Sequence, residues 1–300
     1  MAKLYGPHYA EIWRAALCLP GHTSLADSLA QEYADYRSIS PSAAWERLEE
    51  SWRSHPQRRR QEFPADLEPE KLRRYYDANE QLGMEIGLHW HSLRTDPWPL
   101  HSVAGLHAVQ QMADATSVFE FGHGIGSTGI LFARHGFEVT LGDISHAYRE
   151  FARYRFQRRG LKATFVDLTS TAPQPEAYDA MVSFDVLEHI RNPLPAIRAM
   201  HAGLRSGGLM VLNIAFGRDP DNPEHLLTWR TGVLDRIRAV GFDRVPSASL
   251  LVYYKRELGG ARRALYRVQD LTDALVEDSC ARIPGLRRLV RPYAAPPIGS

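Results

Sequence analysis

The stretch Val118–Gly129 reads VFEFGHGIGSTG, an apolar run that ends in alternating glycines. Such a run predicts a β-strand, a tight glycine turn and the N-terminus of a helix. This combination holds nucleotide-bearing cofactors in many α/β proteins. The glycines alone do not distinguish a dinucleotide from another nucleotide-bearing cofactor, so the neighbouring residues decide.

Two glycine patterns overlap in this stretch. A G-x-G-x-x-G pattern starts at Gly124, as in nicotinamide-dependent oxidoreductases. In that fingerprint an apolar strand residue directly precedes the first glycine, whereas His123 stands there in this chain. Shifted back by two positions, the pattern becomes Glu120-x-Gly122-x-Gly124-x-Gly126, an acid in the strand followed by three alternating glycines. The second pattern disfavours the nicotinamide reading.

The sequence after this stretch alternates between strand and helix patterns. Strands are expected at 118–122, 137–144, 163–168, 178–186 and 207–215, and a final pair at 242–256. Helices are expected between them at 127–135, 146–159, 193–204 and 225–239. Alternating βαβ units predict a doubly wound α/β fold with a mostly parallel, seven-stranded sheet. The closing pair lacks an intervening helix, which implies an antiparallel last strand.

Five segments in this order resemble the motifs of class I S-adenosylmethionine-dependent methyltransferases, small-molecule type. They are EFGHGIG, FARHGFEVTLGDIS, TFVDL, YDAMVSFDVLEHI and LRSGGLMVLNI, within about 116–256. The resemblance implies S-adenosyl-L-methionine as the cofactor. It also implies the cofactor-binding residues Glu120, Gly122, Gly124, Gly126, Asp143, Ile144, Asp167, Leu168, Phe184, Asp185 and Tyr76.

The chemistry of the cofactor agrees with these residues. S-adenosylmethionine has no phosphate, so glycines are needed only to let the backbone approach the ligand. The carboxylate of Asp143 at a strand end suits the two ribose hydroxyls, and a cap for the helix at 146–159 is the less favoured alternative. Asp167 would reach the adenine amine, or would be a plain turn residue before Thr169.

Glu188 and His189 follow the fourth expected strand, beside the transferable methyl group in the resembled fold. His189 is predicted to be the catalytic base, because its ordinary pKa lies near neutrality. Two alternatives remain: Glu188 and His189 would bind a divalent metal, or they would merely position the next helix. No metal is predicted. The remaining substrate-binding candidates are Asn79, His89, Glu188, His225 and Trp229.

Residues 1–112 show helical periodicity and are predicted to form a lid or substrate domain. Helices are expected at 24–37, from 41 through 52, at 69–93 and at 103–112. Tyr76, Asn79 and His89 of this region are expected to face Asp185 and the histidines across the sulfonium. His89 shares an apolar stripe with its neighbours, so core packing is the alternative for it. The methyltransferase domain is expected over 113–258, followed by a helical tail over 259–300.

Composition and charge limit the classes of partner that the chain is expected to bind. The net charge is +1, and the arginines Arg149, Arg153, Arg155, Arg158 and Arg159 read as a solvated helix face, so no nucleic acid is predicted. No apolar run reaches the ~18 residues of a membrane span. A charged N-terminus disfavours a signal peptide, so the chain is expected to be cytoplasmic.

Methyl transfer to the O, N or C atom of a small molecule in specialised metabolism is the leading hypothesis. The alternatives are a non-methylating S-adenosylmethionine-binding protein and, less favoured, a nicotinamide-dependent oxidoreductase. The oligomeric state stays open, and a homodimer is compatible with the sequence.

Overall fold

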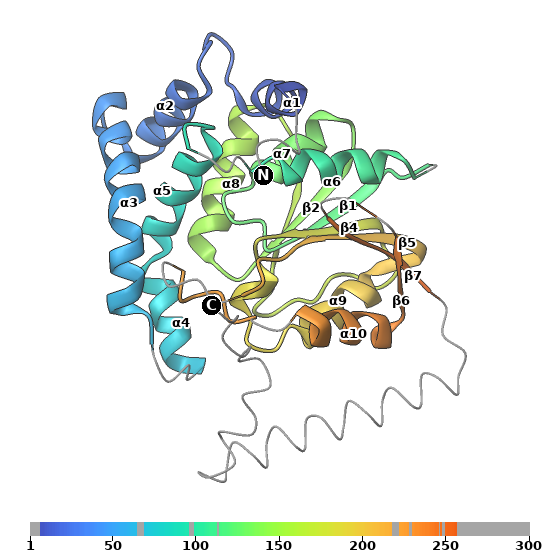
Figure 1. Ribbon diagram of the computed structural model, residues 1–300. Coiled ribbons are helices and arrows are strands. Elements are labelled where there is room, and N and C mark those ends of the chain that lie inside the picture. The colour runs from blue at the N-terminus through green and yellow to red at the C-terminus, as the bar shows by residue number, and fades with distance from the viewer. Residues whose placement is uncertain are drawn as a thin grey trace, which may run out of the picture.

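A seven-stranded sheet forms the centre of the protein (Figure 1). The computed structural model describes residues 7–64, 69–95, 99–112, 114–217, 222–227, 230–245, 247 and 250–256. The strands are β1 (Ser117–Phe121), β2 (Glu138–Asp143), β3 (Thr164–Asp167), β4 (Tyr178–Phe184), β5 (Leu204–Asn213), β6 (Phe242–Val245) and β7 (Leu251–Lys255). Their order is β3-β2-β1-β4-β5-β7-β6, and β7 runs antiparallel to both neighbours. The predicted fold class is confirmed.

Side chains alternate between the two faces of this sheet and build an apolar layer on each. Val118, Val182 and Val211 lie on one face, in a core shared with α6 (His101–Gln110), α7 (Ser127–Arg134) and α8 (His146–Arg158). Phe119 and Met181 lie on the other face, against α9 (Leu194–Gly203) and α10 (Arg230–Val240). A short 3-10 turn, η1 (Leu187–His189), follows β4.

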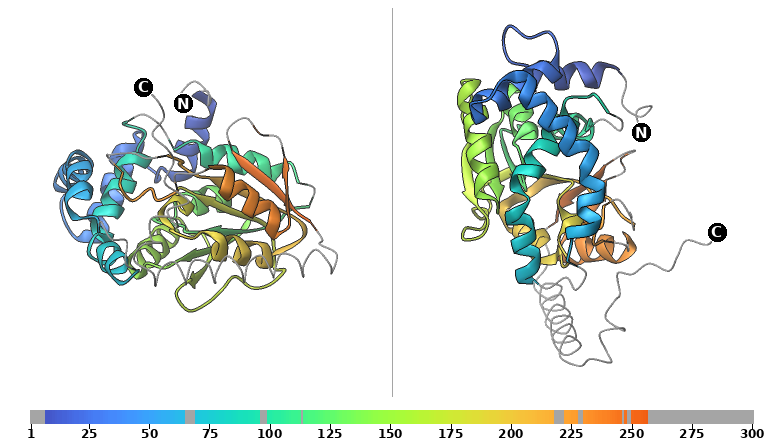
Figure 2. Two further views of the ribbon diagram at one scale, coloured as in Figure 1. Left: turned by 60° about the horizontal axis from the view of Figure 1, so that its bottom comes forward. Right: turned by 90° about the vertical axis from the view of Figure 1, so that its left-hand side faces the viewer.

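Within the described residues, five helices precede α6: α1 (Pro7–Leu17), α2 (Leu25–Arg37), α3 (Pro41–Glu62), α4 (Pro69–Ala78) and α5 (Glu80–His91). Serine caps begin two of them, since the hydroxyls of Ser24 and Ser40 accept the N–H groups of Asp27 and Ala43. The single helix expected over 69–93 is interrupted at Asn79, which leaves helical geometry. In Figure 2, α3 and α5 stand side by side across one end of the sheet.

The N-terminal helices share the core of the sheet. Trp13, Leu29 and Leu88 are fully buried in the same apolar cluster as Ile130 and Phe151. The packing is therefore continuous across the boundary that was expected at residue 112. None of the described helices is both long enough and apolar enough to cross a bilayer.

The helix expected over 225–239 is shorter than predicted, because α10 begins only at Arg230. The preceding backbone groups bind other segments: the Leu226 N–H donates to the Glu188 carbonyl over 2.7 Å, and the Leu227 carbonyl accepts from Gly217 over 3.2 Å. These bonds hold 222–227 as a loop. Trp229 and the tail over 259–300 lie outside the described residues.

The arginines of α8 and its C-terminal end do not form a solvated face, so that prediction was wrong. Arg149, Arg155 and Arg159 are buried, whereas Arg153 and Arg158 retain contact with solvent. The buried arginines bind acids that the sequence places far away: Glu32 of α2 and Asp167 at the end of β3. Helical periodicity within α8 alone carries no sign of those partners.

Candidate active site

The glycine turn after β1 leaves one of its sides open. Gly122, Gly124 and Gly126 have φ of 76°, 50° and 76°, a left-handed region that favours glycine. A Cβ on Gly122 would lie 2.6 Å from Val186, and one on Gly126 would lie 2.8 Å from Ala152. A Cβ on Gly124 would meet no atom within 4 Å. Two of the glycines thus serve packing, and Gly124 borders open space.

Glu120 lies beneath this turn. Its side chain is buried. Burial raises its pKa well above the ordinary range, against the lowering effect of hydrogen bonds from the Gly129 N–H and the Thr128 hydroxyl. Because Gly129 and Thr128 belong to the first turn of α7, Glu120 supports the start of that helix.

Asp143, the last residue of β2, holds the turn by its carboxylate. Oδ2 accepts the Gly124 N–H over 2.9 Å, and Oδ1 accepts the Ser145 N–H over 2.8 Å. The cap of α8 is Ser145, whose hydroxyl accepts from Tyr148. The helix-cap alternative for Asp143 is therefore excluded. The next residue, Ile144, is 62% exposed, so its apolar side chain lies at the surface beside the turn.

Asp167 ends β3 beside Asp143, and its oxygens are engaged within the protein. Oδ2 accepts from Arg149 over 2.8 Å, and Oδ1 accepts the N–H and hydroxyl of Thr169 over 2.9 and 2.6 Å. The bonds from Thr169, then the charge of Arg149, lower its pKa. The adjacent Leu168 N–H donates to the Asp143 carbonyl. The adenine contact of Asp167 and Leu168 stays a prediction.

Asp185 lies where β4 ends, in a left-handed conformation with φ of 54°. Its Oδ2 is 3.0 Å from His101 Nε2, and its Oδ1 accepts from Asn213 Nδ2 over 2.6 Å. Burial opposes ionisation, but His101 and Asn213 outweigh it and lower the pKa of Asp185. Phe184 packs beneath α6, with its ring 5.4 Å from that of His101. The sequence analysis missed His101 and Asn213, although Asn213 ends a strand with a polar residue.

His189 faces a buried acid across the site. Its Nδ1 is 3.8 Å from Oε2 of Glu224, and its ring lies 5.1 Å from that of His225. Burial lowers the pKa of His189 to about 4, while the negative charge of Glu224 opposes this. The imidazole is consequently neutral at pH 7.

Glu224 is held by two N-terminal helices. Tyr75 of α4 donates its hydroxyl to Oε1 over 2.5 Å, and Arg59 of α3 forms an ion pair with the same oxygen at 3.3 Å. Arg59 also donates to the side chain of Asn222. The loop 222–227 is thus fastened to α3 and α4. Sequence reasoning singled out the neighbour His225 instead, because no local pattern links Glu224 to helices so distant in the chain.

The N-terminal candidates separate into two groups. Tyr76 lies against His189, with ring centroids 6.5 Å apart, and its hydroxyl is buried without a partner among the described residues. Asn79 donates its amide to the Tyr75 carbonyl of the preceding helix over 2.9 Å. Tyr76 thus contacts the residues after β4, whereas the amide of Asn79 is bound to the preceding helix.

His89 does not face Asp185, so its expected placement was wrong. Its ring is stacked between those of Trp45 and Trp52 of α3, with centroid distances of 5.5 and 5.0 Å. Burial lowers its pKa. The aromatic side chains of α3 hold His89 within the helical core, which is the alternative given by its apolar stripe.

Glu188 is fully buried behind the site. Its Oε1 accepts the Ala215 N–H over 2.9 Å. Burial, then the negative charge of Asp185, raises its pKa to about 8, so the carboxyl is protonated at neutral pH.

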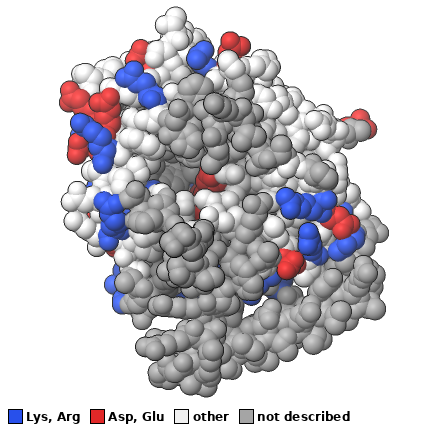
Figure 3. Space-filling view, viewed as in Figure 1, with Lys and Arg blue, Asp and Glu red and all other residues white. Residues whose placement is uncertain are grey.

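Across the described ranges, no three His, Cys, Asp or Glu side chains are grouped so as to hold a metal ion. Figure 3 shows a hollow in this face of the molecule, with acidic side chains within it.

A family model described as "Methyltransferase domain" matches residues 57–249, more than half of the chain. Ubiquinone biosynthesis O-methyltransferase of Vibrio cholerae is 25% identical over 151 residues, which cover 48% of this chain and 58% of that protein. The same enzyme of Vibrio parahaemolyticus is 30% identical over 132 residues, covering 41% and 56%. The chain thus spans less than two thirds of the length of these curated relatives.

Two solved structures are similar to parts of the chain. Phosphoethanolamine N-methyltransferase 2 of Haemonchus contortus, in complex with S-adenosyl-L-methionine, has a TM-score of 0.49 and 17% identity, covering 60% of this chain and 46% of that one. The [4+2]-cyclase SpnF has a TM-score of 0.44 and 20% identity, covering 51% and 61%.

Proposed function

Since the chain belongs to this family of methyltransferase domains, we propose that it methylates a hydroxyl group of a small molecule with S-adenosyl-L-methionine as donor. The observation that carries this proposal is the placement of His189. It is a neutral imidazole at the carboxyl end of β4, between the ring of Tyr76 and the carboxylate of Glu224.

The residues around the glycine turn fit the cofactor. Open space beside Gly124 would let the cofactor approach the backbone of the turn. Each oxygen of Asp143 keeps a lone pair for a ribose hydroxyl, beyond the bonds from Gly124 and Ser145. The exposed side chain of Ile144 offers an apolar surface to the adenine ring. Asp185 and Tyr76 would border the methionine end.

The bound cofactor supplies a methyl group that is already activated by its sulfonium. The protein therefore has to align the acceptor, exclude water and accept one proton. His189 takes the acceptor's hydroxyl proton at Nε2 as the oxygen gains the methyl group. Glu224 faces Nδ1 and stabilises the imidazolium that forms, while Tyr75 and Arg59 keep Glu224 in place. The His189–Glu224 contact is long at 3.8 Å, and catalytic contacts of this kind tighten when the acceptor is bound.

Two further points support oxygen as the acceptor. The curated relatives in Vibrio are named O-methyltransferases. A neutral histidine removes a proton from a hydroxyl, whereas an uncharged amine attacks without prior deprotonation. His225, whose ring borders that of His189, and Asn79 would line the acceptor side. Glu188 would support the acceptor side of the site by holding the backbone at Ala215.

The test uses the full chain, S-adenosylmethionine with an isotopically labelled methyl group, and a panel of phenols, aliphatic alcohols and amines. We expect label in a methyl ether. His189→Ala should lower kcat by ~10²-fold, the usual worth of a general base, with unchanged cofactor affinity in calorimetry. His225→Ala is the matched control, and it should raise KM more than it lowers kcat.

Three outcomes would contradict the proposal. Label found only in amines would exclude the hydroxyl acceptor. A His189→Ala variant with full activity from acid to neutral pH would remove the base. A chain that binds the cofactor and labels none of the acceptor classes would favour the non-methylating alternative.

A further inference from the structure

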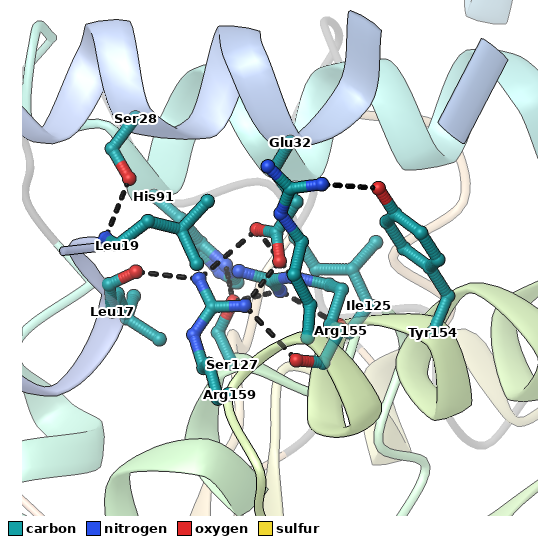
Figure 4. Close-up of polar contacts among 11 residues, drawn as sticks. Leu17, Leu19, Ser28, Glu32, His91, Ile125, Ser127, Tyr154, Arg155 and Arg159 are labelled. Atoms are coloured by element: carbon teal, nitrogen blue, oxygen red, sulfur yellow. Dashed lines mark hydrogen bonds and ion pairs between the residues drawn. The ribbon is translucent and has the colours of Figure 1, made fainter. Parts of the chain in front are cut away.

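A buried ion cluster joins α2 to α8 (Figure 4). Arg155 and Glu32 are both fully buried, and Arg155 Nε is 3.0 Å from Glu32 Oε2. Arg159, just beyond the end of α8, pairs with the same carboxylate. A buried charge is strongly destabilising without its partner, so this cluster fixes α2 on α8.

Arg155 also reaches the glycine turn. Its Nη1 donates to the Ile125 carbonyl over 2.7 Å and to the Ser127 hydroxyl over 2.8 Å. Ile125 lies between Gly124 and Gly126, so the guanidinium is hydrogen-bonded to the middle of the turn. Arg159 differs in this respect, because its other bonds go to the carbonyls of Leu17 and Arg155. The two arginines share one acid, but only Arg155 contacts the turn.

The N-terminal helices reach Ser127 by a second route. His91, at the end of α5, lies with Nδ1 2.8 Å from the Ser127 hydroxyl. Burial, then the charge of Arg155, lowers the pKa of His91 to about 3, so its imidazole is neutral. The Ser127 hydroxyl thus accepts from Arg155 and is hydrogen-bonded to His91 as well. Trp13 of α1 donates its indole N–H to the His91 carbonyl over 3.0 Å.

We propose that Arg155 is a positioning residue for the cofactor, which transmits the docking of α2 to the glycine turn. Glycine has more accessible backbone conformations than any other residue. A turn that contains Gly124 and Gly126 therefore loses much conformational entropy when a ligand orders it. Arg155 removes that freedom beforehand through Ile125, and preorganisation of this kind raises affinity. The inference rests on the cofactor assigned in the proposed function, and it is independent of the acceptor.

The test compares Arg155→Met with Arg159→Met, since each loses one arginine partner of Glu32 in the same buried setting. S-adenosylhomocysteine binding is measured by calorimetry, and Tm is recorded for both variants. We expect Arg155→Met to weaken binding by about tenfold, equivalent to one lost charge-assisted hydrogen bond. Arg159→Met should lower Tm to a similar extent but weaken binding by less than about threefold.

A third variant guards against failed folding. Ser127→Ala keeps the ion cluster and removes one contact of Arg155 with the turn, and it should weaken S-adenosylhomocysteine binding by about threefold. Equal losses in the Arg155 and Arg159 variants would overturn the inference, as would unchanged binding in Ser127→Ala and Arg155→Met. If the folded wild-type chain bound no S-adenosylhomocysteine, the cofactor assignment itself would fail, and this inference with it. Loss of methyl transfer with normal binding would bear only on the proposed acceptor chemistry.

Discussion

At the scale of single residues, similar carboxyl groups differ because their neighbours differ. Asp185 is ionised because His101 and Asn213 stabilise its charge. Glu188, three residues later, accepts the Ala215 N–H, but burial and the charge of Asp185 outweigh its backbone hydrogen bonds and raise its pKa to about 8. The acid that faces the site is thus charged, while the one behind it is neutral. Only the charged acid is suited to orient a cationic ligand group.

This contrast predicts a pH dependence of stability. The pKa of Glu188 is raised on folding, so its contribution is fully present below the unfolded value of about 4.5 and is lost as pH rises towards 8. Glu188→Gln keeps the oxygen that accepts from Ala215 and removes the titration. Between pH 5 and 8 the free energy of unfolding of the wild type should fall relative to this variant by about 1 kcal/mol per pH unit.

Urea denaturation at pH 5, 6.5 and 8 measures the difference. Glu176→Gln serves as the control, because that carboxylate is exposed and makes only a loose ion pair with Lys255. Parallel pH profiles of the wild type and Glu188→Gln would show that Glu188 is ionised in the folded protein, contrary to this expectation.

At the scale of elements, substitutions in the glycine turn should have two different effects, one on stability and one on ligand binding. Gly126→Ala puts a methyl group 2.8 Å from Ala152 and should lower the free energy of unfolding by about 1–3 kcal/mol. Gly124→Ala enters open space, so we expect only the strain of its left-handed backbone, about 1 kcal/mol. It should nevertheless weaken S-adenosylhomocysteine binding by about tenfold or more, since the methyl group would point into the space proposed for the cofactor.

Thermal unfolding and calorimetry on the two alanine variants check this assignment. Normal ligand binding by Gly124→Ala would place the cofactor elsewhere. A larger stability loss in Gly124→Ala than in Gly126→Ala would mean that Gly124, and not Gly126, packs closely against neighbouring atoms.

The elements that the sequence predicted well are those set by local periodicity. Strand alternation and the glycine pattern located β1, α7 and the Asp143 strand end, because each depends on residues close together in the chain. The partners that the sequence missed come from distant segments: Arg59 and Tyr75 bind Glu224, and Glu32 binds Arg155. No single sequence pattern joins an acid in α2 to an arginine in α8. Long-range pairing therefore had to come from the structure.

At the scale of the whole molecule, the N-terminal helices are part of the folding unit. Leu17, Tyr33 and Leu48 are fully buried in the cluster that also contains residues of β1, β2 and α8. Removing the N-terminal helices would uncover this apolar surface and leave Arg155 without its acid. We therefore do not expect the sheet and its cofactor site to remain folded without these helices.

Deletion of residues 1–112 should therefore prevent folding of the remainder, and turnover should be abolished as a consequence. The expected loss exceeds the 5–15 kcal/mol by which domains are usually stable, given the number of buried side chains removed. Circular dichroism and thermal unfolding of the truncated chain provide the measurement. A truncated chain that unfolds cooperatively and binds S-adenosylhomocysteine would establish the sheet as an independent domain.

The stacking of His89 between Trp45 and Trp52 has an optical consequence. Every tryptophan except Trp229 lies before residue 113, so the intrinsic tryptophan fluorescence of the protein comes almost entirely from residues 1–112. Separation of α3 from α5 would break this stacking and change the surroundings of both indoles, so we expect their emission to change with it. The chain thus carries its own reporter of that separation. Stopped-flow mixing with a ligand can time it without any attached dye.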